Sequence, residues 1–101
     1  ELDHAVKMAD ALILEAPDFA EAINQRAIAH YFAGRPLESS EDCRKVLERN
    51  PYHLGALSGL GQCLIKLDRR AEAIKVYRQA SAVSPYDESL KAIIAELEAG
   101  L

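Results

Sequence analysis

Three prolines recur at a constant spacing along this chain of 101 residues. Pro51 follows Pro17 by 34 residues, and Pro85 follows Pro51 by the same number. Proline cannot continue a preceding helix and restrains the residue before it, so the spacing predicts helix ends at equal intervals. A constant period of this size is typical of a stacked array, in which each unit packs only against its neighbours.

The best-defined unit lies between Leu54 and Pro85. Its hydrophobic residues recur at steps of three and four, which predicts two short helices with one apolar stripe each. Neither helix can bury that stripe alone, so each is expected to pack against the other and against a neighbouring copy. The stripes consist of Leu57, Leu60, Gly61 and Leu64 in the first helix, and of Ala73, Ile74, Tyr77 and Ala80 in the second.

This pattern resembles the tetratricopeptide repeat family, in which a bulky residue, Leu-Gly and an aromatic residue are followed by Ala, an aromatic residue, Ala and Pro. The unit carries it at Leu57, Leu60-Gly61, Ala73, Tyr77, Ala80 and Pro85, with Leu64 in the first aromatic position. The preceding unit matches more loosely, at Ile23, Arg26-Ala27, His30, Ser39, Cys43, Val46 and Pro51. The resemblance implies an all-α, right-handed solenoid of antiparallel helix pairs, with about six helices and no strands.

The repeat phase divides the single expected domain, residues 1–101, into four parts. These are a second helix of a truncated repeat (1–16), two repeats (18–51 and 52–85) and a terminal or capping helix (86–101). Helices are expected at residues 1–15, 19–33, 37–49, 53–67, 70–83 and 88–99. Asp18 and Asp87 are the expected helix N-caps, and Gly100 is the expected helix stop.

The chain lacks an initiating Met and opens within a helical pattern, so we interpret it as a piece of a longer protein. No signal peptide is visible in it. The location of the parent protein is therefore open: the cytoplasm is slightly favoured, and the periplasm remains an alternative if the parent carries a signal peptide.

Composition argues against several classes of function. The net charge of −4 gives no basic footprint for nucleic acid, and no apolar run is long enough to span a membrane. No spacing of acids, bases or nucleophiles indicates catalysis, so we expect no enzyme activity, no catalytic residue, no metal and no cofactor. His30 is expected to be packed and hydrogen-bonded within a helix pair, and His53 to be exposed.

Cys43 and Cys63 fall on helices that are expected to be neighbours. The favoured interpretation is two buried, reduced thiols, because free cysteine behaves as a small buried hydrophobic residue. A disulfide is the alternative, and it requires Cα atoms within about 7 Å of each other. The sequence does not decide whether the two residues are close enough to pair.

In tetratricopeptide repeats the first helix of each unit lines a concave groove, and the resemblance implies the same here. Amides and apolar side chains facing it would suit an extended peptide or a partner helix. Tyr31 and, second to it, Phe32 are the expected anchors, with packing into the core as the alternative. The predicted groove residues are Asn24, Gln25, Ile28, Tyr31, Phe32, Gly55, Ser58, Gly59, Gln62, Ile65, Lys66 and Ile93, with Glu21, Ser89, Ala92 and Glu96 beside them.

Gly55 and Gly59 lie four residues apart in the middle of a predicted helix, where each costs about 1 kcal/mol relative to alanine. We hypothesise a shallow trough, floored by these glycines and Ser58, in which a ligand backbone lies close. Close packing of a neighbouring helix, or of a second molecule, is the equal alternative.

The predicted function is a non-catalytic protein-interaction scaffold that binds a peptide or partner segment in the groove. The Lys/Asn clamp with which some members hold the C-terminal carboxylate of chaperones is not matched at Gly55, Gly59, Ser89 or Ile93. One alternative is a structural unit of a longer array, self-associating as a homodimer through the last helix and through Leu2, Val6 and Ala9. Another is a regulatory domain fused to an enzyme outside this segment.

Overall fold

A computed structural model of the chain describes residues 2–100, so Glu1, at the start of the first predicted helix, lies outside the described residues. The six predicted helices are confirmed, and no strand occurs among residues 2–100. The helices are α1 (Leu2–Glu15), α2 (Ala20–Phe32), α3 (Pro36–Arg49), α4 (Leu54–Lys66), α5 (Arg70–Val83) and α6 (Glu88–Glu98).

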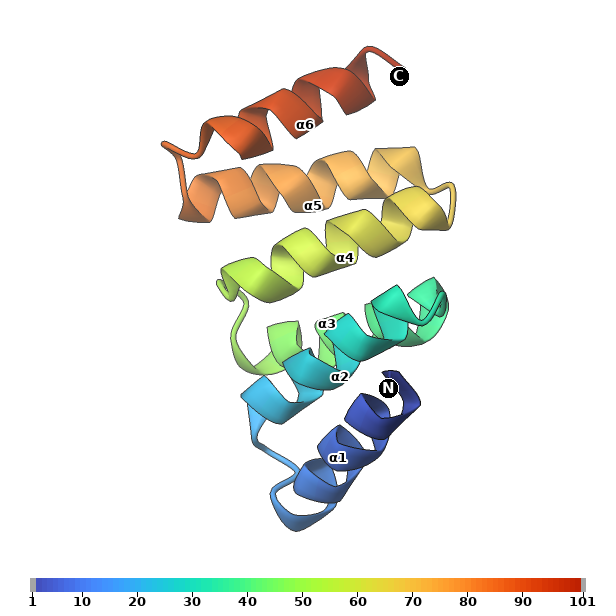
Figure 1. The fold of residues 1–101 in the computed structure, drawn as a ribbon. Helices are drawn as coiled ribbons and strands as arrows, with labels where there is room; N and C mark the ends of the chain where they lie inside the picture. The colour runs from blue at the N-terminus through green and yellow to red at the C-terminus, as the bar shows by residue number, and fades with distance from the viewer. Residues whose placement is uncertain (1, 101) are drawn as a thin grey trace.

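The helices form an elongated stack of 42 × 25 × 18 Å. Successive helices run in opposite directions, and α1 and α6 lie at opposite ends of the stack (Figure 1). Each helix packs against the next in the chain, and α2 also contacts α4, the first helix of the following pair. This is the helical solenoid that the 34-residue period predicts. No described helix has the length and apolar character needed to cross a membrane.

The main core lies between α4 and α5. Leu57, Leu60, Leu64 and Tyr77 are almost completely buried there, as the apolar stripes predict. A Cβ atom at Gly61 would lie only 2.5 Å from the Tyr77 ring, so the absence of a side chain at Gly61 lets the ring pack directly on α4. Burial also raises the pKa of the Tyr77 hydroxyl to about 12.

Between α1, α2 and α3 an ion pair occupies a position that is apolar one repeat later. The Nε and Nη2 atoms of Arg26 each donate to the Asp42 carboxylate at 2.7 Å, and its Nη1 atom donates to Asp10 at 2.8 Å. Asp42 is only 3% exposed. The hydrogen bonds from Arg26 to Asp42 raise the pKa of the guanidinium. Arg26 therefore ties three helices together through charge, where the corresponding Leu60 uses packing.

The turns within the two helix pairs adopt the same left-handed backbone at equivalent positions. Gly34 has φ +78° and Asp68, which follows it by 34 residues, has φ +60°. Pro36 occupies the first turn of α3, where its missing N–H is not needed. At the last helix, the predicted cap is confirmed, because the Asp87 carboxylate accepts hydrogen bonds from the Ser89 and Leu90 amides.

Three local predictions are wrong. Asp18 does not cap α2: Phe19 is the N-cap residue, and the Asp18 carboxylate instead accepts a hydrogen bond from Arg49 Nη2 at 3.0 Å. His53 is half-buried, because its Nδ1 atom accepts from the Ala56 amide and caps α4. His30 is packed as predicted, but its buried Nδ1 atom has no hydrogen-bond partner.

Candidate binding groove

A small cavity of about 50 Å³ lies between α2 and α4, with α3 behind it. Seven of the twelve predicted groove residues line it, so residues about 30 positions apart meet at one site as the repeat phase predicts. These seven are Asn24, Ile28, Tyr31, Phe32, Gly55, Gly59 and Gln62. The remaining lining residues are Ala27, Ser39 and Cys43, which sequence analysis did not place in the groove.

The α2 wall of the cavity is apolar and open to solvent. Phe32 is 69% exposed and Ile28 is 43% exposed, whereas Tyr31 is half-buried. The Tyr31 and Phe32 rings meet edge to face, with their centroids 5.4 Å apart. Phe32 therefore offers more surface to a ligand than Tyr31, and Tyr31 holds the Phe32 ring in place.

A second hollow of about 450 Å³ extends the site past the ends of α2 and α4. It shares Tyr31 and Phe32 with the cavity and adds Lys66, so the two aromatic residues stand between both spaces. Gly34, in the turn before α3, and Pro36, the first residue of α3, complete the lining of this hollow. The aromatic pair is thus the centre of a continuous, largely apolar surface.

The other predicted groove residues lie outside the cavity and the hollow. The amide of Gln25 is engaged on its own helix, where it donates to Glu21 at 2.9 Å. Ser58 is half-buried and Ile65 is exposed on α4, and neither lines either space. Ile93 is half-buried and packs against the main core. The cavity is therefore built by α2, α3 and α4, with no contribution from α6.

The two unexplained glycines approach neighbouring side chains closely. A Cβ atom at Gly55 would lie 3.2 Å from the His53 ring, and a Cβ atom at Gly59 would lie 3.3 Å from Cys43 Sγ. Close packing of α3 therefore accounts for part of the need for glycine at position 59. Both glycines line the cavity, so the trough stays a hypothesis beside this packing role.

Cys43 and Cys63 are both buried and both free, which confirms the favoured interpretation. Across the α3–α4 interface, the interaction between the two thiols raises the pKa of Cys43 and lowers the pKa of Cys63, and burial adds to the rise at Cys43.

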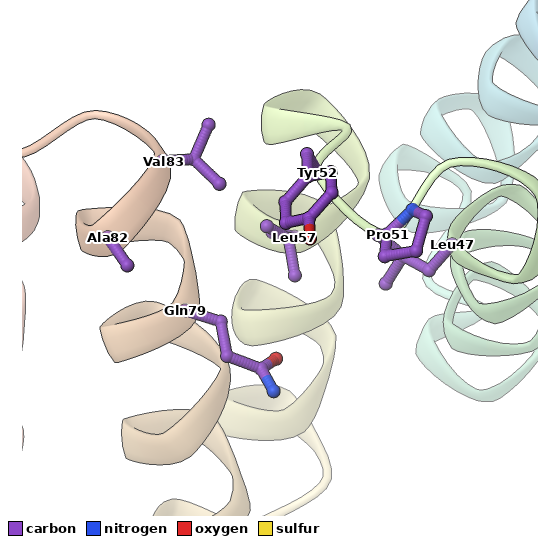
Figure 2. Close-up of a pocket in the computed structure, with 7 residues that line it drawn as sticks. All are labelled: Leu47, Pro51, Tyr52, Leu57, Gln79, Ala82 and Val83. Atoms are coloured by element: carbon purple, nitrogen blue, oxygen red, sulfur yellow. The ribbon is translucent and has the colours of Figure 1, made fainter.

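A larger hollow, of about 560 Å³, opens between α3, α4 and α5 (Figure 2). Its lining is uncharged and shares no residue with the groove cavity: Leu47, Pro51, Tyr52, Leu57, Gln79, Ala82 and Val83. Sequence analysis missed this hollow, although a comparison of equivalent positions in the two repeats could have indicated it. One repeat earlier, Asp18 and Arg49 stand where Tyr52 and Val83 stand here, and their ion pair bridges that corner.

No group of three or more His, Cys, Asp or Glu side chains within residues 2–100 is arranged to hold a metal ion. The groove offers an apolar wall, an aromatic pair, the amides of Asn24 and Gln62, and one cation, Lys66.

Comparisons with known proteins agree with this architecture. A family model described as tetratricopeptide repeat matches residues 33–97. A TPR repeat-containing protein of Rhizobium etli is 31% identical over 85 residues, which is 84% of this chain and 42% of that protein. The chain thus spans less than half the length of the curated relative that it matches.

Solved structures share the fold at low sequence identity. The first TPR of Spaghetti (RPAP3) bound to the HSP90 peptide SRMEEVD superposes with a TM-score of 0.93 at 18% identity, over 98% of this chain and 79% of that one. MamA superposes with a TM-score of 0.92 at 16% identity, over 98% of this chain and 58% of the MamA chain. The TPR2B domain of yeast Sti1, in a complex with an Hsp70 peptide, superposes with a TM-score of 0.89 at 20% identity, over 99% of this chain and 85% of that one. The 34-residue phase, the stacked helix pairs and the family model that matches more than half of the chain all agree. This chain belongs to the tetratricopeptide repeat family.

Proposed function

We propose that this chain is a non-catalytic protein-interaction module that holds an extended peptide or partner segment in the groove between α2 and α4. The observation that carries the proposal is the convergence of exposed apolar side chains and amides on one cavity. Phe32 and Ile28 supply apolar contact area, and the Gln62 amide supplies hydrogen bonds to a peptide backbone.

Two of the similar structures support this reading, since their descriptions name bound peptides of HSP90 and Hsp70. The chemistry of the groove points to a different class of peptide. Lys66 is the one cation among the residues that line the cavity and the adjoining hollow. A groove with an aromatic pair and a single lysine favours a peptide with apolar side chains over an acidic chain end.

The test begins with selection from a phage-displayed library of short random peptides, followed by titration of the best synthetic peptide. Phe32→Ala and Gln62→Ala should each weaken its binding, the first by about tenfold or more. Tyr52→Ala is the matched control, because Tyr52 is an equally exposed aromatic residue in the other hollow. Equal affinity of all four proteins for the peptide, or no selected peptide at all, would refute the proposal.

The glycine trough is tested with the same peptide. Alanine at both Gly55 and Gly59 fills space in the cavity, so a ligand backbone that lies there should lose affinity. Higher stability of the double variant with unchanged binding would discard the trough and leave close packing as the explanation.

Self-association is the second candidate, because α1 exposes large apolar side chains. Leu12 and Leu14 are exposed, with Leu14 at 84%, and Leu2 and Met8 are exposed as well. The expected contact through Ala9 is wrong, because Ala9 is buried in the stack. Size-exclusion chromatography with light scattering separates the two candidates. A dimeric fraction that rises with protein concentration and is lost in Leu14→Lys supports self-association.

A further inference from the structure

The two helices that wall the groove present different chemistry at matching positions. α2 and α4 each contain 13 residues and run in the same direction, because α3 returns the chain between them (Figure 1). They end at Phe32 and Lys66, which are one repeat period apart. Ile28 and Gln62 are related in the same way, one turn earlier on each helix. The groove therefore has two levels, each with an apolar side chain on α2 and a polar side chain on α4.

The spaces between the helices agree with this matching. Ile28 and Gln62 both line the cavity of about 50 Å³, and Phe32 and Lys66 both line the hollow of about 450 Å³. Phe32 lines both spaces, so the two levels adjoin. The residues of α4 that line them contribute no apolar side chain; they are Gly55, Gly59, Gln62 and Lys66.

Lys66 is exposed and uncompensated in the part of the chain that the structure describes. Lys45 and Lys91 lie 3.8 and 3.3 Å from carboxylate oxygens, whereas no carboxylate within residues 2–100 pairs with Lys66. Its place in the last turn of α4 suits a cation, because the carboxyl end of a helix is negative, but this role leaves the ammonium group open to a ligand. A free cation beside an apolar wall is complementary to an acidic side chain of a bound peptide.

An extended peptide matches the spacing of the two levels. Alternate residues of a strand lie about 6.6 Å apart and point to the same side, whereas neighbouring residues point to opposite sides. Four residues of a helix rise about 6 Å, which is the spacing from Ile28 to Phe32 on α2 and from Gln62 to Lys66 on α4. A strand that lies along the groove therefore places every second side chain against α2 and the side chains between them against α4.

We propose that the groove selects an extended peptide with two apolar residues separated by one position, and with an aspartate or glutamate directly next to one of them. The apolar pair packs on Ile28 and Phe32, and the acidic side chain, on the other side of the strand, pairs with the ammonium group of Lys66. This inference rests on the proposed function and names the class of peptide that the groove takes.

The experiment repeats the selection from the phage-displayed random library with the wild type and with Lys66→Glu. The wild type should select the apolar pair with an adjoining acidic residue, and Lys66→Glu should select a basic residue in its place. The best wild-type peptide is then synthesised in three forms. One is the selected sequence, one has lysine in place of the acidic residue, and one has the acidic residue moved by one position, which turns it to the other side of the strand.

The affinities of these peptides test the charge and its direction separately. Lys66→Glu should bind the selected peptide about tenfold more weakly than the wild type and should bind the lysine form more tightly than the wild type does. The wild type should bind the moved form several-fold more weakly than the selected form, although the two have the same composition and charge. Lys75→Glu is the matched control, because exposed Lys75 on α5 lines neither the cavity nor the adjoining hollow, and it should bind like the wild type.

The results that overturn this inference differ from those that overturn the proposed function. Selected peptides that lack the adjoining acidic residue, equal affinity of wild type and Lys66→Glu for the selected peptide, or full affinity for the moved form overturn the inference. The groove function stands in these cases if Phe32→Ala still weakens binding. A selected peptide whose affinity is unchanged in both Phe32→Ala and Gln62→Ala binds elsewhere, and that result, like the absence of any selected peptide, overturns both.

Discussion

The Arg26–Asp42 ion pair can be exchanged for the apolar pair that the protein itself uses one repeat later. Leu60 and Val76 occupy the positions 34 residues beyond Arg26 and Asp42; Leu60 belongs to the main core, and the half-buried Val76 packs against it. The informative set of variants is therefore Arg26→Leu, Asp42→Val and the two together. Each substitution installs a residue that already fits the same place in the fold.

The single substitutions should differ in cost. Arg26→Leu leaves the Asp42 carboxylate, which is 3% exposed, with only Lys45 at 3.8 Å, so it should lower the free energy of unfolding by about 3–5 kcal/mol. Asp42→Val should cost less, about 2 kcal/mol. In that variant the Arg26 side chain, already 18% exposed, keeps its hydrogen bond to Asp10 and can reach water.

The double variant should be close to the wild type or more stable by about 1–4 kcal/mol, because it removes both desolvated charges together. Urea unfolding of the four proteins measures these differences and the coupling between the two sites. Asp18→Ala, which breaks the exposed ion pair between the α1–α2 turn and Arg49 on α3, is the control and should change stability by no more than about 1 kcal/mol. If the double variant loses the sum of the two single losses, the ion pair does not act as a unit and the reasoning fails.

Three further predictions follow from single contacts. His30→Leu should stabilise the protein by about 1 kcal/mol in urea unfolding, because it removes an unpartnered buried Nδ1 atom and matches the fully buried Leu64 one repeat later; a loss of stability would contradict this. Gly61→Ala should cost about 1–3 kcal/mol, because the added Cβ atom would lie 2.5 Å from the Tyr77 ring, and an unchanged melting temperature would count against that contact. The hydrogen bond from the Ser89 hydroxyl holds the pKa of Asp87 below its ordinary value of 3.8, so this cap stabilises the fold above that pH and is lost as the pH falls through the lowered pKa. The difference in melting temperature between the wild type and Asp87→Ala should therefore be largest at neutral pH and shrink in acid, and a constant difference would refute the assignment.

The repeat phase was sufficient to predict the fold because it depends on local properties. Proline spacing and the three-and-four periodicity specify where helices end and which side of each is apolar, and these requirements hold whatever the neighbours are. The same phase brought seven predicted residues to one cavity, since residues at equivalent positions of stacked helices necessarily lie near each other.

Side-chain partners were harder to predict because they depend on which groups compete in space. Asp18 suits a helix cap by residue type, yet Arg49, 31 residues later, offers its carboxylate a charged partner. His53 has the position of an exposed turn residue, yet it caps α4 through Nδ1. Tyr31 and Phe32 are adjacent in sequence, and only the packing of α2 against its neighbours decided that Phe32 is the more exposed ring.

By itself, the sequence determined the number and type of the helices, their order and the apolar face that each one buries. Those features follow from backbone geometry and hydrophobic burial within about one helix pair. The tertiary structure decided which side chains meet: the charged link through Arg26 and the closeness of Gly59 to Cys43. These depend on side-chain positions between helices, set to within about an ångström by the packing of the whole stack, and no local pattern in a chain specifies them.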